Sequence, residues 1–115
     1  MRVKMSEKYI TEREEICKKI IDILQLDSEG FFYIHELDEN IDKQNQIMGL
    51  RDSIKKYFTV SNISSFKPNF ICKKPYLNII RSILRQQDYK VEYTNIVLKY
   101  DNGMMRRTTK YKIYR

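Results

Sequence analysis

The side chains with the clearest chemistry in this sequence are cations on either side of a predicted turn near the C-terminal end. Residues 89–100 and 104–114 are β-prone runs around an Asp-Asn-Gly stretch at 101–103, and Asn-Gly is a strong signal for a two-residue hairpin turn. With that turn, the alternation of side chains gathers on one face Lys99, Arg106, Lys110 and Lys112, together with Tyr93. Clustered cations of this kind are suited to phosphate groups.

This register pairs Lys99 with Arg106 and Tyr93 with Lys112. Like charges directly opposite each other are unfavourable in a sheet, which favours an anion bound beside them. The other face would carry the side chains that seal the core: Ile96, Leu98, Met105, Tyr111 and Ile113. The alternative is an exposed lysine-bearing face that deters edge aggregation, and a shift of the turn by one residue would exchange the faces.

A predicted helix just before the hairpin supplies two more candidate cations. Arg81 and Arg85 follow Asn78 at helical spacing, so the three side chains share one polar stripe. Lys73 and Lys74 precede that stripe and would extend the basic face. Arginine is suited to bidentate phosphate contacts, although an ordinary solvated helix face is the alternative.

An earlier predicted helix presents Arg51, Lys55 and Lys56 away from its apolar stripe. A basic helix after a short acidic one, with a hairpin later in the chain, resembles a winged helix-turn-helix. In that arrangement a recognition helix enters the major groove and the hairpin wing contacts phosphate. The helix at Pro75 departs from the simple form, because it intervenes before the hairpin. A solvated helix face is again the alternative.

Signals for catalysis or metal binding are weak. His35 is the single histidine, and its neighbours Glu36 and Asp38 fit a helix start better than an acid–base pair. Cys17 and Cys72 lie in apolar-periodic segments, which predicts buried thiols and neither a disulfide nor a zinc site. No glycine-rich phosphate loop or nucleophile motif occurs. We therefore expect a non-enzyme that uses no metal or cofactor.

The positive charge of the chain is concentrated in its second half. Residues 1–58 hold 10 Lys/Arg against 12 Asp/Glu, a net of −2, whereas residues 59–115 hold 12 against 3, a net of +9, and the sum is +7. This separation indicates a basic face for a polyanion, with nucleic acid first and an anionic membrane second. No apolar run approaches the roughly 18 residues of a membrane span, and no signal-peptide core opens the chain, so we expect an intracellular protein.

A chain of 115 residues with 42% hydrophobic side chains predicts one α+β domain with a sizeable core, helical over 7–58 and formed by a helix plus β-hairpin over 75–115. Thr11 and Glu14 fit a capping box. The expected elements, in chain order, are a helix of about four turns from Thr11, a brief strand or apolar lead at 31–34, an acidic helix at 35–41, a helix at 42–58 that contains Gly49, a strand or loop at 59–67, a helix from Pro75 and the hairpin.

Two C-terminal segments carry a family resemblance. Residues 74–81, Lys-Pro-Tyr-Leu-Asn-Ile-Ile-Arg, and residues 106–113, Arg-Arg-Thr-Thr-Lys-Tyr-Lys-Ile, resemble small uncharacterised proteins of nucleocytoplasmic large DNA viruses. Residues 54–58, Ile-Lys-Lys-Tyr-Phe, add to the resemblance, which covers the C-terminal half. It implies a virus-encoded protein that acts in the cytoplasm or nucleus of an infected host. It implies no reaction.

Together these observations predict non-enzymatic binding of nucleic acid, DNA in preference to RNA, largely through phosphate. The expected contacts are Lys99, Arg106, Lys110 and Lys112, then Arg81 and Arg85, with Arg51, Lys55 and Lys56 as a secondary patch. The alternative is a homo-oligomeric interaction module in which the acidic half of one subunit meets the basic half of another. We expect a homodimer at micromolar concentration.

Overall fold

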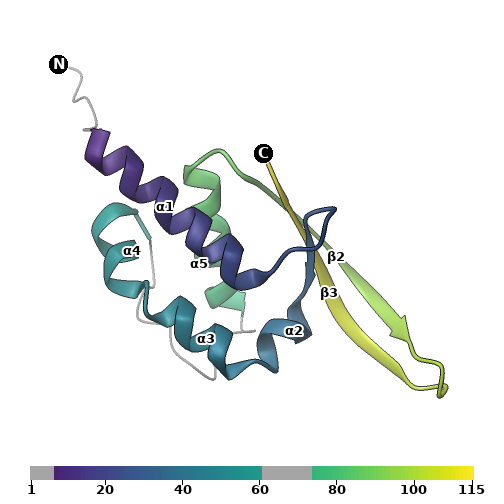
Figure 1. Ribbon diagram of the computed structural model, residues 1–115. Helices are drawn as coiled ribbons and strands as arrows, with labels where there is room; N and C mark the ends of the chain where they lie inside the picture. The colour runs from purple at the N-terminus through teal and green to yellow at the C-terminus, as the bar shows by residue number, and fades with distance from the viewer. Residues whose placement is uncertain (1–6, 61–73) are drawn as a thin grey trace.

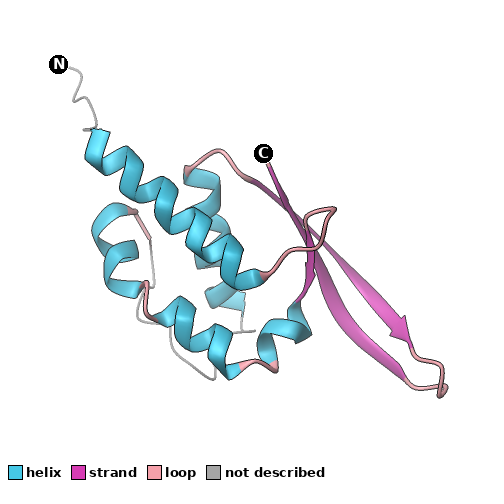
Figure 2. Ribbon diagram, viewed as in Figure 1, coloured by secondary structure: helices cyan, strands magenta, loops and turns pink. Residues whose placement is uncertain are grey.

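Helices and strands occupy different sides of the molecule, which is a computed structural model describing residues 7–60 and 74–115 (Figures 1 and 2). The described elements are the helices α1 (Glu7–Leu24), α2 (Ile34–Asp38), α3 (Ile41–Met48), α4 (Arg51–Tyr57) and α5 (Lys74–Gln86), and the strands β1 (Phe31–Tyr33), β2 (Lys90–Lys99) and β3 (Met105–Tyr114). The strands form one antiparallel sheet in the order β1-β3-β2. The predicted α+β class is confirmed.

The hydrophobic core lies between the helices and the base of the sheet. On α1, Ile16, Ile20 and Leu24 recur every four residues and are buried, as expected for one face of an amphipathic helix. Further buried apolar side chains in the described part of the chain come from α5, from the sheet and from the helices between: Ile79, Ile80, Ile83, Leu84, Phe32, Val91, Ile113, Leu37, Ile47, Ile54 and Phe58. This core holds α5 and the base of the hairpin in one fixed arrangement.

For residues 31–34 the sequence allowed either a brief strand or an apolar lead into the next helix. The structure has the strand, β1. It pairs with β3 so that Phe32 lies opposite Tyr111, and it adds a strand from the N-terminal half to the C-terminal hairpin. Gly30 makes this approach possible, because its φ is +86° and an added Cβ would lie 2.8 Å from the carbonyl oxygen of Ile113. The Gly30 carbonyl in turn accepts a hydrogen bond of 2.9 Å from the Ile113 N–H.

The predicted capping box is wrong, because α1 begins at Glu7 and Thr11 lies within the helix. Glu14 faces the end of the chain and accepts two hydrogen bonds of 2.7 Å from the Arg115 guanidinium. These bonds from Arg115 are the main cause of a lowered pKa at Glu14. The guanidinium also stacks 4.3 Å from the ring centre of Tyr89, so this cluster joins α1 to the segments that flank β2 and β3.

The single helix predicted over 42–58 is wrong as well, since it is divided into α3 and α4. The break falls at Gly49 and Leu50, yet Ile47 and Ile54 on either side are both fully buried. The helical spacing of apolar residues therefore continues from α3 into α4, although the chain changes direction between them. The predicted acidic helix at 35–41 is the shorter α2. Most of the 59–67 segment lies outside the described residues.

Candidate nucleic-acid interface

The turn of the hairpin has three residues, not the two that the sequence predicts. The Tyr100 N–H donates to the Met104 carbonyl at 2.9 Å, and the Gly103 N–H donates to the Tyr100 carbonyl at 3.0 Å. Gly103 has φ of +83°, whereas Asn102 is not among the residues with positive φ. A type I′ turn needs positive φ at both central residues, so this is the type I turn closed by a glycine bulge.

This turn moves the register by one residue and corrects the predicted basic face. Lys99 lies opposite Met105, and Arg106 lies opposite Leu98. The odd-numbered residues of β2 and β3 form what we call the inner face, which faces α5, and the even-numbered residues form the outer face. Lys99 is on the inner face, while the other three predicted cations, Arg106, Lys110 and Lys112, are on the outer face. Ile96 and Leu98 are also on the outer face, and not on the core side.

On the outer face, lysines lie over aromatic rings. The Lys110 ammonium is 3.9 Å from the ring centre of Phe31, and the Lys112 ammonium is 5.5 Å from that ring and 5.2 Å from Tyr114. The Lys90 ammonium is 5.8 Å from Tyr114. Each such cation–π contact contributes about 0.5–1 kcal/mol at an exposed site. These lysines therefore have partners within the protein.

The helix α2 occupies the next part of the outer face. Arg106 forms an ion pair with Glu39, whose pKa is lowered chiefly by the hydrogen bond from that guanidinium. Thr108 is buried, and its hydroxyl lies 2.9 Å from Nδ1 of His35. The single histidine is thus tied to β3, and Arg106 is already matched by an acid.

On the inner face, α5 and the hairpin enclose a hollow of about 310 Å³. It is lined by Leu77, Asn78 and Arg81 of α5 and by Tyr93, Asn95, Thr109 and Tyr111 of the strands. The Arg81 guanidinium donates to the Asn78 side-chain oxygen at 3.2 Å, as their shared stripe predicts. Arg85 is exposed and lies 3.5 Å from the carbonyl oxygen of Val91.

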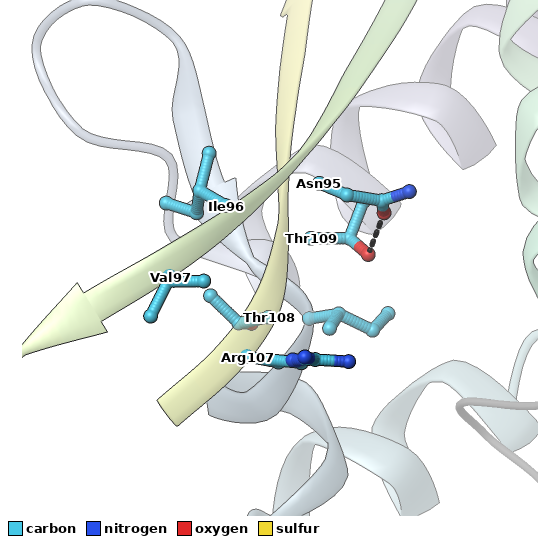
Figure 3. A pocket seen from close by; sticks show the side chains of 7 residues that line it. Asn95, Ile96, Val97, Arg107, Thr108 and Thr109 are labelled. Carbon is cyan, nitrogen blue, oxygen red and sulfur yellow. Dashed lines mark hydrogen bonds between the residues drawn. The ribbon is translucent and has the colours of Figure 1, made fainter. Parts of the chain in front are cut away.

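Beyond this hollow the hairpin extends away from the helices (Figure 1). Figure 3 shows Asn95 and Thr109 joined across the two strands, where the Thr109 hydroxyl donates to the Asn95 side chain at 2.9 Å. Arg107 lies opposite Val97. A two-residue turn would instead have placed it opposite Leu98, on the face that was predicted to seal the core. The inner face contains two cations, Lys99 and Arg107, and no acidic residue. The assumption of a two-residue turn is the reason why Arg107 was missed as a candidate. A three-residue turn at the same Asp-Asn-Gly signal would have placed Arg107 on the same face as Lys99.

The secondary patch is separate from this surface. Lys55 and Lys56 are exposed on α4, Arg51 is half-buried, and the Lys56 ammonium lies 5.4 Å from the Tyr57 ring centre. In Figure 1, α4 lies at the opposite end of the molecule from the hairpin turn. A single ligand surface formed by all the predicted cations is therefore excluded.

The described residues hold no group of three or more His, Cys, Asp or Glu side chains placed to bind a metal. Cys17 is buried as predicted, its thiol lies 3.8 Å from the carbonyl oxygen of Ile83, and burial raises its pKa to about 12. Cys72 lies outside the described residues. Within residues 7–60 and 74–115, no helix is both long and apolar enough to cross a bilayer.

Comparison with protein-family models, with curated proteins and with solved structures gives no match to this chain. The geometry of α5 and the hairpin is therefore the basis for assigning a function.

Proposed function

We propose that this protein is a non-enzymatic, intracellular DNA-binding protein whose contact surface is α5 together with the inner face of the hairpin. The observation that carries the proposal is the hollow between Arg81 on α5 and Asn95 on β2, continued outward by Lys99 and Arg107. This surface combines cations with amide and hydroxyl groups and includes no acidic residue on the strands.

The residue types on this surface match the two kinds of contact that DNA offers. Arginine and asparagine form bidentate hydrogen bonds with guanine and adenine edges, which suits Arg81 and Asn78 on a helix. Cations on the hairpin contact phosphate, which positions a protein without reading sequence. Lys99 and Arg107 are suited to that second role.

The order of the elements supports α5, and not α4, as the helix that meets DNA. The helix α5 directly precedes β2, and its apolar residues Ile79 and Ile83 pack in the core, so its polar side is held beside the inner face. A helix followed by a projecting hairpin is the winged-helix arrangement, in which helix and wing act together. This support is an analogy at the level of the fold. In this proposal α5 has the role of recognition helix that the sequence pattern gave to the predicted helix at 42–58.

The direct test is binding of the purified chain to duplex DNA, single-stranded DNA and RNA, measured by fluorescence anisotropy over a salt series. We expect tightest binding to the duplex, with log K falling linearly against log salt. Equal affinity for all three at every salt concentration, or no binding at low salt, would reject the proposal. Addition of a chelator serves as a control and should leave affinity unchanged.

A further inference from the structure

We propose that two copies of this chain pair along the free edge of β2, antiparallel and about a two-fold axis at Asn95. The two three-stranded sheets would become one continuous sheet. This interface differs from the expected contact between an acidic half and a basic half. It does not depend on DNA binding.

The first observation is the open edge of β2. Among the strands of residues 7–60 and 74–115, β2 has β3 as its one neighbour, because the sheet order is β1-β3-β2. Tyr100 donates to the carbonyl of Met104, so the hydrogen-bonded pairs of β2 and β3 fall at even-numbered residues. The N–H and C=O groups of odd-numbered β2 residues therefore point outward. The Arg85 guanidinium, which lies 3.5 Å from the Val91 carbonyl oxygen, agrees with this direction.

The second observation is that β2 is not shortened, bulged or interrupted by proline, and that its two lysines, Lys90 and Lys99, stand only at its ends. It runs for ten residues, Lys90–Lys99, with no proline and with unbroken one-to-one pairing to β3. Natural edge strands are commonly shortened, bulged or interrupted by proline. An edge of this length is a template for another strand.

The third observation is self-complementarity. A two-fold axis perpendicular to a sheet keeps each face on its own side, so odd-numbered residues meet odd-numbered residues. With the axis at Asn95, Tyr93 of each copy lies opposite Val97 of the other. These are the two most exposed large hydrophobic residues of β2, at 56% and 50%. Aromatic side chains opposite β-branched ones are favourable cross-strand pairs.

The same register avoids charge conflict. Lys99 would lie opposite Val91 of the second copy, and Lys90 opposite Tyr100, so no lysine faces a lysine. On the outer face Thr94 would lie opposite Ile96. Moving the axis by one residue to either side leaves Tyr93 without Val97 opposite, so the exposed apolar pair selects this one register.

The pairing has a consequence for ligand geometry, and this consequence does rest on the proposed DNA binding. Because the axis is perpendicular to the sheet, the inner faces of both copies and both α5 helices lie on the same side. A duplex bound there would meet two symmetry-related surfaces. Dimerisation would be measured without DNA, so failure of either proposal is seen separately.

The first experiment measures mass by sedimentation equilibrium over a concentration series. We expect the 14.0 kDa chain to reach twice that mass. Val97→Pro removes an outward N–H and an exposed side chain but no hydrogen bond to β3, and it should stay monomeric. Val97→Lys gives the same test without a proline. Met104→Ser, a change at an exposed apolar residue beyond the strand, should dimerise like the parent.

The second experiment tests the register by disulfide trapping in a Cys72→Ser background. Asn95 would face itself across the axis with Cα atoms about 5.5 Å apart, a separation that suits a disulfide. Asn95→Cys should therefore give a covalent dimer on mild oxidation. Val97→Cys should not, because its two copies would be about 13 Å apart along the strands. A monomer at all concentrations, a dimer unaffected by both Val97 changes, or equal trapping at both positions would overturn the proposal.

Discussion

The outer face of the hairpin carries four basic residues and the inner face carries two, and the faces differ in what those residues contact. On the outer face, Arg106 pairs with Glu39, and Lys110 lies against Phe31. On the inner face, Lys99 and Arg107 have no ion pair or ring contact with any residue in the described part of the chain. Net charge therefore overstates the basic surface that is open to a ligand, and the partners of each cation decide which face is available.

The largest expected effect comes from removing inner-face cations. Lys99→Gln combined with Arg107→Gln should lower the slope of log K against log salt by about 2, or about 0.9 for each lost phosphate contact, and reduce affinity roughly 100-fold near 0.1 M salt. The matched outer-face pair, Lys110→Gln with Lys112→Gln, should change the slope by much less. Anisotropy titrations compare the two variants. Equal losses from both pairs would remove the distinction between the faces.

The second-largest expected effect is a loss of stability from a change next to β1, the strand that brings Phe31 to the outer-face lysines. Gly30→Ala forces a side chain into a backbone with φ of +86° and places Cβ 2.8 Å from the Ile113 carbonyl oxygen. We expect a loss of about 2 kcal/mol in the free energy of unfolding, from the left-handed conformation and the clash together. Urea melts measure this. Gly103→Ala, which has the same kind of φ but open space around Cβ, should lose less.

DNA affinity of folded Gly30→Ala protein should stay near that of the parent, because β1 lies on the side of β3 away from β2. A large loss of affinity at a temperature where the variant is folded would show that the outer face contributes to binding.

These two predictions also show what local sequence patterns can and cannot supply. The helices α1 and α5 and the existence of the hairpin are predictable, because apolar spacing and an Asn-Gly turn are local signals. The hairpin register is not, because Asn-Gly fits both a two-residue and a three-residue turn, and one residue of shift exchanges the faces. Lys99 and Arg107 were misplaced for this single reason.

Other features depend on contacts between distant residues. The hydrogen bonds between Arg115 and Glu14 join residues that are 101 positions apart, and no local sequence pattern predicts them. The three-residue strand β1 is too short for an alternation signal, and its pairing depends on a close approach at Gly30. The break at Gly49 is hidden because Ile47 and Ile54 keep helical spacing on both sides of it.

The third prediction concerns the ion pair that joins α1 to the end of β3. Arg115→Gln should lower the free energy of unfolding modestly at neutral pH, since the pair is bidentate and partly exposed. The folded-state pKa of Glu14 is lowered, so this stabilisation is present above the carboxyl's ordinary pKa of 4.5 and is lost as pH falls through the lowered value. Urea melts at pH 7 and in acid should show the difference shrinking. A difference that persists in acid, or that Lys55→Gln reproduces, would contradict this account.

The smallest expected effect comes from releasing Arg106. Glu39→Gln removes the acid that pairs with Arg106 on the outer face, while leaving the inner face unchanged. Both side chains of this pair are substantially exposed, so stability should hardly change. If DNA meets only the inner face, the freed guanidinium does not reach phosphate, and the salt slope should equal that of the parent. Asp42→Asn, a change at an exposed acid on α3, controls for the altered net charge. A rise in slope of about 0.9 with Glu39→Gln, and not with the control, would indicate one new phosphate contact from the outer face. The two faces would then not differ in their access to DNA.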